Sequence, residues 1–154
     1  MQKTAVLLHN VRSAHNVGAI FRTADAAGVS RIFLTGYTPL PRDRFGRGQK
    51  EIAKTALGAE GFIPWESATP AALIERLRAG GWRIVGIEQD DSARDFREFR
   101  AVQPTLFVFG NEVRGLSRPL RAACDELLEI PMRGKKESLN VAVAAGIILF
   151  GVQR

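Results

Sequence analysis

The chain has 154 residues, of which 45% are hydrophobic and 25% are charged; these values exclude a disordered or fibrous protein and predict one domain over residues 1–154. The net charge of +6 fits a polyanionic partner such as nucleic acid and fits an ordinary basic enzyme equally well. A single cysteine, Cys124, excludes an intrachain disulfide and suits a reducing compartment.

Neither end of the chain predicts a membrane segment. The first residues lack the length and cleavage pattern of a signal peptide, and the longest apolar stretch, residues 141–152, is too short to span a bilayer. We therefore expect a cytoplasmic protein without membrane attachment.

The N-terminal part predicts a strand, a helix and a second strand. Thr4–His9 is a short apolar run typical of a buried strand. Apolar residues recur at helical spacing over Val17–Gly28, with Ser13 or Asn16 as the N-cap and a glycine at the C-terminal end. Arg31–Thr35 predicts the second strand.

A long basic loop interrupts this pattern over residues 36–56 and leads into a short helix. Beyond it we predict a strand at Phe62–Trp65, a helix at Pro70–Ala79 and a strand at Trp82–Glu88. Residues 90–103 are polar and are expected at the surface.

The last third of the chain holds two strands and a long apolar helix. Thr105–Phe109 and Glu126–Ile130 predict strands, separated by a short helix or turn at Leu120–Cys124. Leu139–Val152 is apolar almost all round, which predicts a core helix packed on several faces. Strands that alternate with helices predict an α/β fold with a parallel sheet and flanking helices.

Several common chemistries find no support in the sequence. No phosphate-binding G-x-x-x-x-G-K-[ST] or dinucleotide-binding G-x-G-x-x-G motif follows a strand, and no G-x-S-x-G motif is present. The only histidines are His9 and His15, and no H-x-x-x-H or C-x-x-C spacing occurs, so no metal site is expected.

Three polar constellations stand at predicted strand ends and helix starts. Each has an ordinary explanation when taken alone: a solvated helix arginine, a turn with a salt bridge to Arg114, and a helix N-cap. Their joint occurrence at the edge of a predicted α/β sheet favours a ligand site. The constellations are Asn16-x-Gly18-x-x-x-Arg22, Asn111-Glu112-x-x-Gly115 and Ser138-x-Asn140.

These constellations belong to longer motifs that are similar to those of a known family. The chain resembles the SpoU (TrmH-like) branch of the SPOUT superfamily, the S-adenosylmethionine-dependent RNA ribose 2′-O-methyltransferases, over nearly its whole length. The motifs that carry the resemblance are His15–Gly28, Phe109–Leu116, Ile130–Met132 and Ser138–Ala144.

The resemblance implies an α/β sheet whose C-terminal segment forms a deep trefoil knot. It also implies a homodimer through the knot region, with the active site near the interface. S-adenosylmethionine is the implied methyl donor, S-adenosylhomocysteine the product, and no metal is expected. The residues implied in donor binding are Ile87, Glu88, Gly110, Asn111, Gly115, Ile130, Met132, Ser138 and Leu139.

The resemblance assigns Arg22 to the reacting hydroxyl. A guanidinium hardly ever gives up its proton, so hydrogen bonds to the developing alkoxide and to the neighbouring phosphate are the easier role. We expect Glu112 to hold Arg22 or Arg114 in position and Asn140 to support it at the start of the core helix. Asn16 and Ser138 are expected to bind the target phosphate, and Ile130 and Leu139 to flank the adenine of the donor.

The implied substrate is tRNA or rRNA, and no separate RNA-binding domain is predicted. Substrate capture is then left to this domain, a dimer or a helper protein, with the basic segment Arg42–Lys54 as the candidate contact to the RNA backbone. Two alternatives remain: an RNA-binding protein of the same fold that has lost catalysis, and a base-directed RNA methyltransferase. The Asn16 to Arg22 motif favours ribose as the target.

Overall fold

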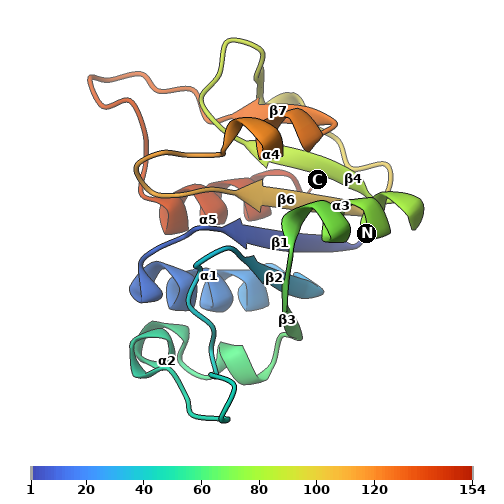
Figure 1. The fold of residues 1–154 in the computed structure, drawn as a ribbon. Helices are drawn as coiled ribbons and strands as arrows, with labels where there is room; N and C mark the ends of the chain where they lie inside the picture. The colour runs from blue at the N-terminus through green and yellow to red at the C-terminus, as the bar shows by residue number, and fades with distance from the viewer. Residues whose placement is uncertain (1, 154) are drawn as a thin grey trace.

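The computed structural model describes residues 2–153, which form one seven-stranded sheet in which all paired strands are parallel (Figure 1). The strand order is β3-β2-β1-β6-β4-β7-β5. The strands are β1 (Thr4–His9), β2 (Arg31–Thr35), β3 (Trp65–Ala68), β4 (Arg83–Ile87), β5 (Arg94–Asp95), β6 (Thr105–Phe109) and β7 (Glu126–Glu129).

Helices cover both faces of the sheet, so the predicted fold class of a parallel sheet with flanking helices is confirmed (Figure 1). Helices α1, α2 and α5 pack on one face, whereas α3 and α4 pack on the other. The helices are α1 (Ala14–Ala26), α2 (Lys50–Ala56), α3 (Pro70–Ala79), α4 (Arg118–Ala123) and α5 (Val141–Gly151), with single 3-10 turns at Ala59–Gly61 and Phe96–Glu98.

The central strands are apolar throughout because both of their faces are covered. In β1, Val6 and Leu8 contribute to the core under α1 and α5, while Ala5 and Leu7 contribute to the core under α3 and α4. Phe107 of β6 is fully buried. These continuous apolar runs explain why β1, β2 and β6 have the bounds that the sequence predicts.

Two edge segments differ from the prediction. The predicted strand Phe62–Trp65 is wrong, since the N–H of Ile63 still bonds the carbonyl of Ala59 and strand pairing with β2 begins only at Trp65. The expectation that residues 90–103 lie wholly at the surface is also wrong. This segment contributes β5 to the sheet edge and buries Phe96 and Phe99 in the core.

Helix α5 begins at Val141, two residues after the predicted start at Leu139, because Asn140 is its N-cap. It is not packed on all of its sides within the chain. Ile148 and Leu149 are buried, whereas Val143, Ile147 and Phe150 are 52%, 36% and 51% exposed. The predicted burial on several faces is therefore wrong for a single chain. These three residues form one apolar face of α5 that no other part of residues 2–153 covers. Contiguous exposed apolar patches are uncommon on the surface of a monomeric protein.

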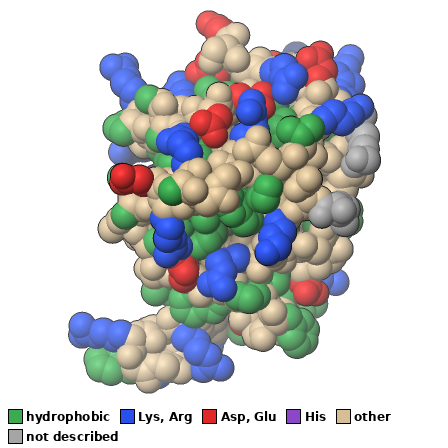
Figure 2. Space-filling view, turned by 90° about the vertical axis from the view of Figure 1, so that its right-hand side faces the viewer, with side chains coloured by type: hydrophobic (Ala, Val, Ile, Leu, Met, Phe, Trp, Pro, Cys, Tyr) green, Lys and Arg blue, Asp and Glu red, His purple; other side chains and the backbone are tan. Residues whose placement is uncertain are grey.

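The basic segment between β2 and α2 is organised by an aspartate. The backbone N–H groups of Phe45 and Arg47 donate to Asp43 at 2.9 and 3.0 Å, and an antiparallel bridge pairs Arg42 with Gly48. The N–H of Arg47 is the main cause of a lowered pKa at Asp43. Figure 2 shows Lys and Arg side chains projecting at the lowest part of the molecule, where Figure 1 places this segment.

Two further expectations concern the chain as a whole. The C-terminal knot stays a prediction that comes with the family resemblance. Within residues 2–153, the structure contains no helix of the length and apolarity needed to cross a bilayer.

The close approach of α1 and α2 depends on a helical glycine, and this gives a first prediction. A Cβ on Gly18 would lie 2.0 Å from Thr55 Oγ1 and 2.3 Å from the carbonyl oxygen of Ile52. Gly18→Ala should therefore lower the free energy of unfolding by about 1–3 kcal/mol in urea titrations, because the two helices must separate.

The matched control is Gly146→Ala in α5, where a Cβ would meet only Thr23 Cγ2 at 3.6 Å. Because alanine is the better helix former, this control should change the free energy of unfolding by less than about 1 kcal/mol. Equal stability of Gly18→Ala and the unmodified chain would contradict the proposed packing.

Candidate functional site

The carboxyl ends of β4, β6 and β7 meet in one cleft that opens to solvent. Parallel strands end at the same edge of a sheet, so the loops that follow them converge there. The start of α5 closes the cleft with Val141 and Ala144. All nine residues predicted for donor binding line it: Ile87, Glu88, Gly110, Asn111, Gly115, Ile130, Met132, Ser138 and Leu139.

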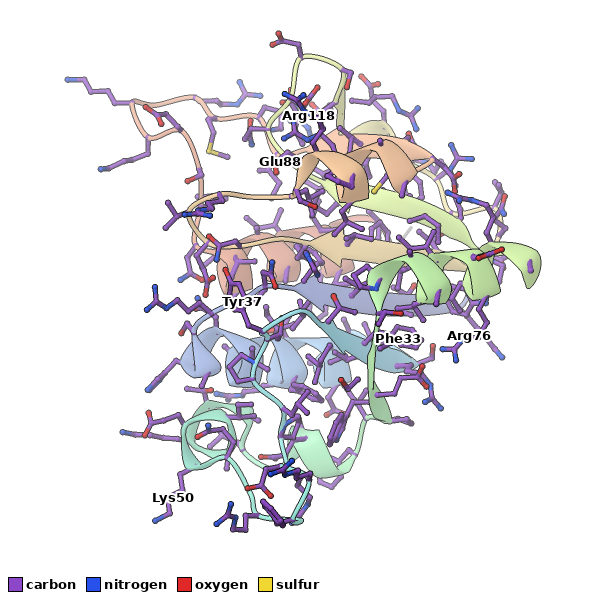
Figure 3. The ribbon with its side chains drawn as sticks, in the orientation of Figure 1. Phe33, Tyr37, Lys50, Arg76, Glu88 and Arg118 are labelled. Carbon is purple, nitrogen blue, oxygen red and sulfur yellow. The ribbon has the colours of Figure 1, made fainter. Side chains whose placement is uncertain are left out.

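Two side chains at the end of β4 fix the walls of this cleft. The backbone N–H of Leu116 donates to Glu88 Oε2 at 2.6 Å, and Gln89 Nε2 donates to the carbonyl of Ile130 at 2.7 Å. Gly115 has φ of +67°, and a Cβ there would lie 2.2 Å from Glu88 Oε2. The β4 end therefore holds both the β6 loop and the β7 loop (Figure 3 labels Glu88).

Glu112 joins the β6 loop to the turn that follows β1. Its two carboxylate oxygens accept hydrogen bonds from the N–H groups of Arg12 and Ser13 at 2.9 and 2.8 Å, and from Asn16 Nδ2 at 3.0 Å. The predicted contact of Glu112 with Arg22 or Arg114 is wrong. The N–H groups of the turn just before α1 bind this carboxylate instead.

Asn16 connects the same network to the third motif. Asn140 Nδ2 donates to Asn16 Oδ1 at 3.2 Å. Asn140 is also the N-cap of α5, because its Oδ1 accepts the N–H groups of Ala142 and Val143 at 2.8 and 3.3 Å. The bonds from Glu112 to Asn16 and from Asn16 to Asn140 thus link residues of all three motifs beside the cleft.

Arg22 lies elsewhere, although the sequence predicts it as the central catalytic residue. Its exposed side chain lines a separate surface hollow with Lys54 of α2 and Phe150 of α5. No hydrogen bond or ion pair to another residue of 2–153 involves its guanidinium. The structure therefore gathers Asn16, Glu112, Ser138 and Asn140 around the cleft and leaves Arg22 outside the cleft of its own chain.

The charge state of Glu112 follows from its contacts. Burial raises the pKa of this carboxyl, but the N–H groups of Arg12 and Ser13, together with Asn16, outweigh burial, and the net pKa is lowered. The carboxylate is therefore ionised at neutral pH, in the form that accepts all three hydrogen bonds.

Metal chemistry gains no support from the described residues. Within residues 2–153, no group of three or more His, Cys, Asp or Glu side chains is placed to hold a metal ion. Burial raises the pKa of the Cys124 thiol to about 12, so this cysteine is neither a ready nucleophile nor a ready metal ligand.

Comparison with known proteins decides the family, because the SpoU rRNA Methylase family matches residues 3–150. The chain belongs to this family. It is 36% identical over 148 residues to the 23S rRNA (guanosine-2′-O-)-methyltransferase RlmB of Pseudomonas aeruginosa, covering 96% of this chain and 57% of RlmB.

Solved structures of SpoU relatives agree with this assignment. The S-adenosylmethionine-bound rRNA methyltransferase of Sinorhizobium meliloti is 36% identical with a TM-score of 0.87, and the match covers 98% of this chain and 56% of that one. The TrmH/SpoU tRNA modifying enzyme of A. aeolicus is 30% identical with a TM-score of 0.85, covering 99% and 75%. The chain spans somewhat more than half the length of the curated relatives it matches.

Sequence reasoning missed two residues that shape the site of this SpoU chain. Gln89, which directly follows the predicted residue Glu88, donates to the carbonyl of Ile130. Its position as a polar residue just after a predicted strand could have indicated this role. Tyr37 follows β2, and its hydroxyl accepts a hydrogen bond from Asn111 Nδ2 at 3.0 Å. A lone tyrosine in a loop forms no pattern that a sequence could reveal.

The role of Glu112 gives a second prediction. Glu112→Gln replaces one acceptor oxygen with an NH₂ group that faces N–H donors, so it should lower the free energy of unfolding by about 1 kcal/mol at neutral pH. The folded-state pKa is lowered, so this contribution is present above the unfolded-state pKa and is lost as pH falls through the folded-state pKa.

Urea unfolding of both proteins at about pH 7 and about pH 3 measures this, and the stability difference should shrink in acid. Glu75→Gln on α3, an exposed position, is the control and should have little effect at either pH. A difference that stays constant across this range would mean that the carboxylate charge is not what joins the loops.

Proposed function

We propose that this chain transfers a methyl group from S-adenosylmethionine to a ribose 2′-hydroxyl of tRNA or rRNA, and that it works as a homodimer. The observation that carries the proposal is the single cleft at the ends of β4, β6 and β7. It contains every residue expected to bind the donor, and the linked residues of the three motifs stand beside it.

The residues of the cleft fit S-adenosylmethionine. Its lining combines apolar side chains with a few polar groups, as in pockets that hold cofactors. Ile130, Leu139 and Val141 provide apolar walls suited to an adenine ring, and the loop at Gly110 provides backbone polar groups. When bound, the donor supplies an electrophilic methyl group on a sulfonium, and this chain supplies orientation.

The polar network positions the target nucleotide beside the donor. Asn16 uses Oδ1 and one N–H of its amide within the protein, which leaves one N–H for a phosphate or ribose oxygen. Ser138 is exposed in the cleft and offers a hydroxyl to the same group. Both side chains thus hold the substrate, while Glu112 and Asn140 hold Asn16.

Arg22 binds the reacting hydroxyl and reaches the cleft from a second copy of the chain. The uncovered face of α5, formed by Val143, Ile147 and Phe150, supports a dimer, and Phe150 belongs to the hollow that contains Arg22. In the proposed dimer, two copies pack on this face so that Arg22 of one copy serves the cleft of the other. The guanidinium keeps its proton and stabilises the developing alkoxide, and the hydroxyl proton passes to water or to a phosphate oxygen of the RNA.

The RNA substrate is supported by the charge of the chain and by the printed names of its relatives. A net charge of +6 and the basic segment Arg42–Lys54 suit phosphate contacts. The RlmB relative is named for rRNA and the A. aeolicus relative for tRNA, so both RNA classes stay within the proposal. With an RNA substrate of either class, we infer a cytoplasmic location.

Mixed dimers test this proposal. Arg22→Ala should abolish methyl transfer and leave S-adenosylhomocysteine affinity unchanged in calorimetry, because Arg22 lies outside the donor cleft of its chain. Leu139→Asp should abolish donor binding, because it puts a carboxylate on the apolar cleft wall. A mixture of the two inactive variants should regain about a quarter of the unmodified activity, since mixed dimers contain one intact composite site.

Size-exclusion chromatography provides the control that both variants remain dimers. No recovered activity in mixed dimers would mean that Arg22 acts within its own chain, and lost donor affinity in Arg22→Ala would make Arg22 structural. Nuclease digestion and mass spectrometry of the treated RNA separate ribose from base methylation. An unmodified chain that binds RNA but not S-adenosylhomocysteine would be a binding protein without this activity.

A further inference from the structure

A second hollow lies directly beside the donor cleft and shares one wall with it. The shared wall is the loop Asn111–Val113, which lines both cavities. The far side of the second hollow is formed by the turn after β1 and by Tyr37, which follows β2. Figure 3 places Tyr37 at the edge where the strands end. A ligand in this hollow would therefore lie next to the donor.

Tyr37 is held in place at both ends while its ring faces solvent. Its backbone N–H donates to Asn10 Oδ1 at 3.0 Å, and its hydroxyl accepts from Asn111 Nδ2 at 3.0 Å. Asn111 Nδ2 also donates to the carbonyl of Asn10 at 2.9 Å. The side chain nevertheless remains 58% exposed. An aromatic ring that is both fixed and exposed offers a preformed stacking surface.

The backbone that holds Tyr37 is left-handed at two residues. Asn10 adopts φ of +56°, a left-handed conformation that asparagine adopts more readily than most residues. Gly36 is also left-handed at +64°, and a Cβ there would lie 1.8 Å from Asn10 Oδ1. This turn fixes the backbone of Tyr37, whose side chain is not part of either hydrophobic core.

Two unpaired guanidinium groups line the same hollow. Arg12 and Arg114 stand with Tyr37 among its lining residues, and both are exposed. Neither side chain has a hydrogen-bond or ion-pair partner within the described part of the chain. A fixed aromatic ring with free arginines is the combination that binds unpaired nucleotides, by stacking on the base and contacting phosphates.

The basic segment offers another exposed aromatic ring with arginines, but its geometry suits stacking less well. Phe45 is 67% exposed, yet the guanidinium groups of Arg44 and Arg47 lie 4.8 and 5.1 Å from its ring centre. Its ring is therefore already in contact with cations of its own segment. Tyr37 has no such covering group and stands next to the donor cleft.

We propose that this hollow is the subsite for the unpaired nucleotide that is methylated. Its base stacks on Tyr37, and Arg12 and Arg114 bind the flanking phosphates. This subsite rests on the proposed function, because its role is to place the ribose of the bound nucleotide beside the methyl donor in the neighbouring cleft. It also predicts that the substrate nucleotide is unpaired or pulled out of a helix.

The single tyrosine of the chain allows a direct test. Biosynthetic incorporation of 3-fluorotyrosine gives one fluorine resonance, which reports on position 37 alone. Titration with a mixed-sequence single-stranded RNA should shift this resonance through the ring current of a stacked base. The same sequence as a blunt duplex should produce a much smaller shift. An unshifted resonance at saturating single-stranded RNA, or an equal shift with the duplex, would overturn the proposal.

Affinity measurements with variants complete the test. Tyr37→Ala should weaken binding of the single-stranded RNA about tenfold or more, whereas Tyr37→Phe, which keeps the ring, should stay within about threefold. Both variants should bind S-adenosylhomocysteine like the unmodified chain, which controls for the fold. Unchanged RNA affinity of Tyr37→Ala would overturn the subsite alone. If the unmodified chain does not bind S-adenosylhomocysteine, the proposed function itself is overturned.

Discussion

The carboxylate of Glu112 is the contact on which the arrangement of the site depends. It follows β6, yet it accepts the first N–H groups of the turn that leads from β1 into α1. Ser13 is the N-cap of α1, where N–H groups have no partner within the helix and the helix dipole is positive, so an ionised carboxylate is favoured there. Asn16 extends the contact to Asn140 at the start of α5. Segments about 100 residues apart in the chain are thereby aligned at one edge of the sheet.

The central part of the fold was predictable because its signals are local. Strands β1, β2 and β6 are continuous apolar runs, and the helix Pro70–Ala79 begins at a proline and ends before a glycine. The edge strands β3 and β5 were not predicted correctly. They have four and two residues, and pairing with β2 and β7 defines them, so no local pattern marks their bounds.

Helix α5 illustrates a different limit of sequence reasoning. An apolar sequence indicates that a surface is buried, but it does not distinguish burial within the chain from burial against a second copy. Ile148 and Leu149 contact the core, while Val143 and Phe150 of the same helix do not. The residues that line the cleft at the ends of β4, β6 and β7 were easier to predict, because motif residues directly after parallel strands must meet at one edge. The sequence led us to predict an arginine as the partner of Glu112. A sequence shows which side chains are charged, but it does not show which backbone N–H groups lack a partner.

A crystal structure with S-adenosylhomocysteine would test the central claim most directly. The account predicts the adenosine between Ile130 and Leu139, backbone contacts at Gly110, and the sulfur facing Arg22 of a second copy across the α5 interface. A cleft that stays empty at saturating S-adenosylhomocysteine, or a bound sulfur far from Arg22 of either copy, would contradict it.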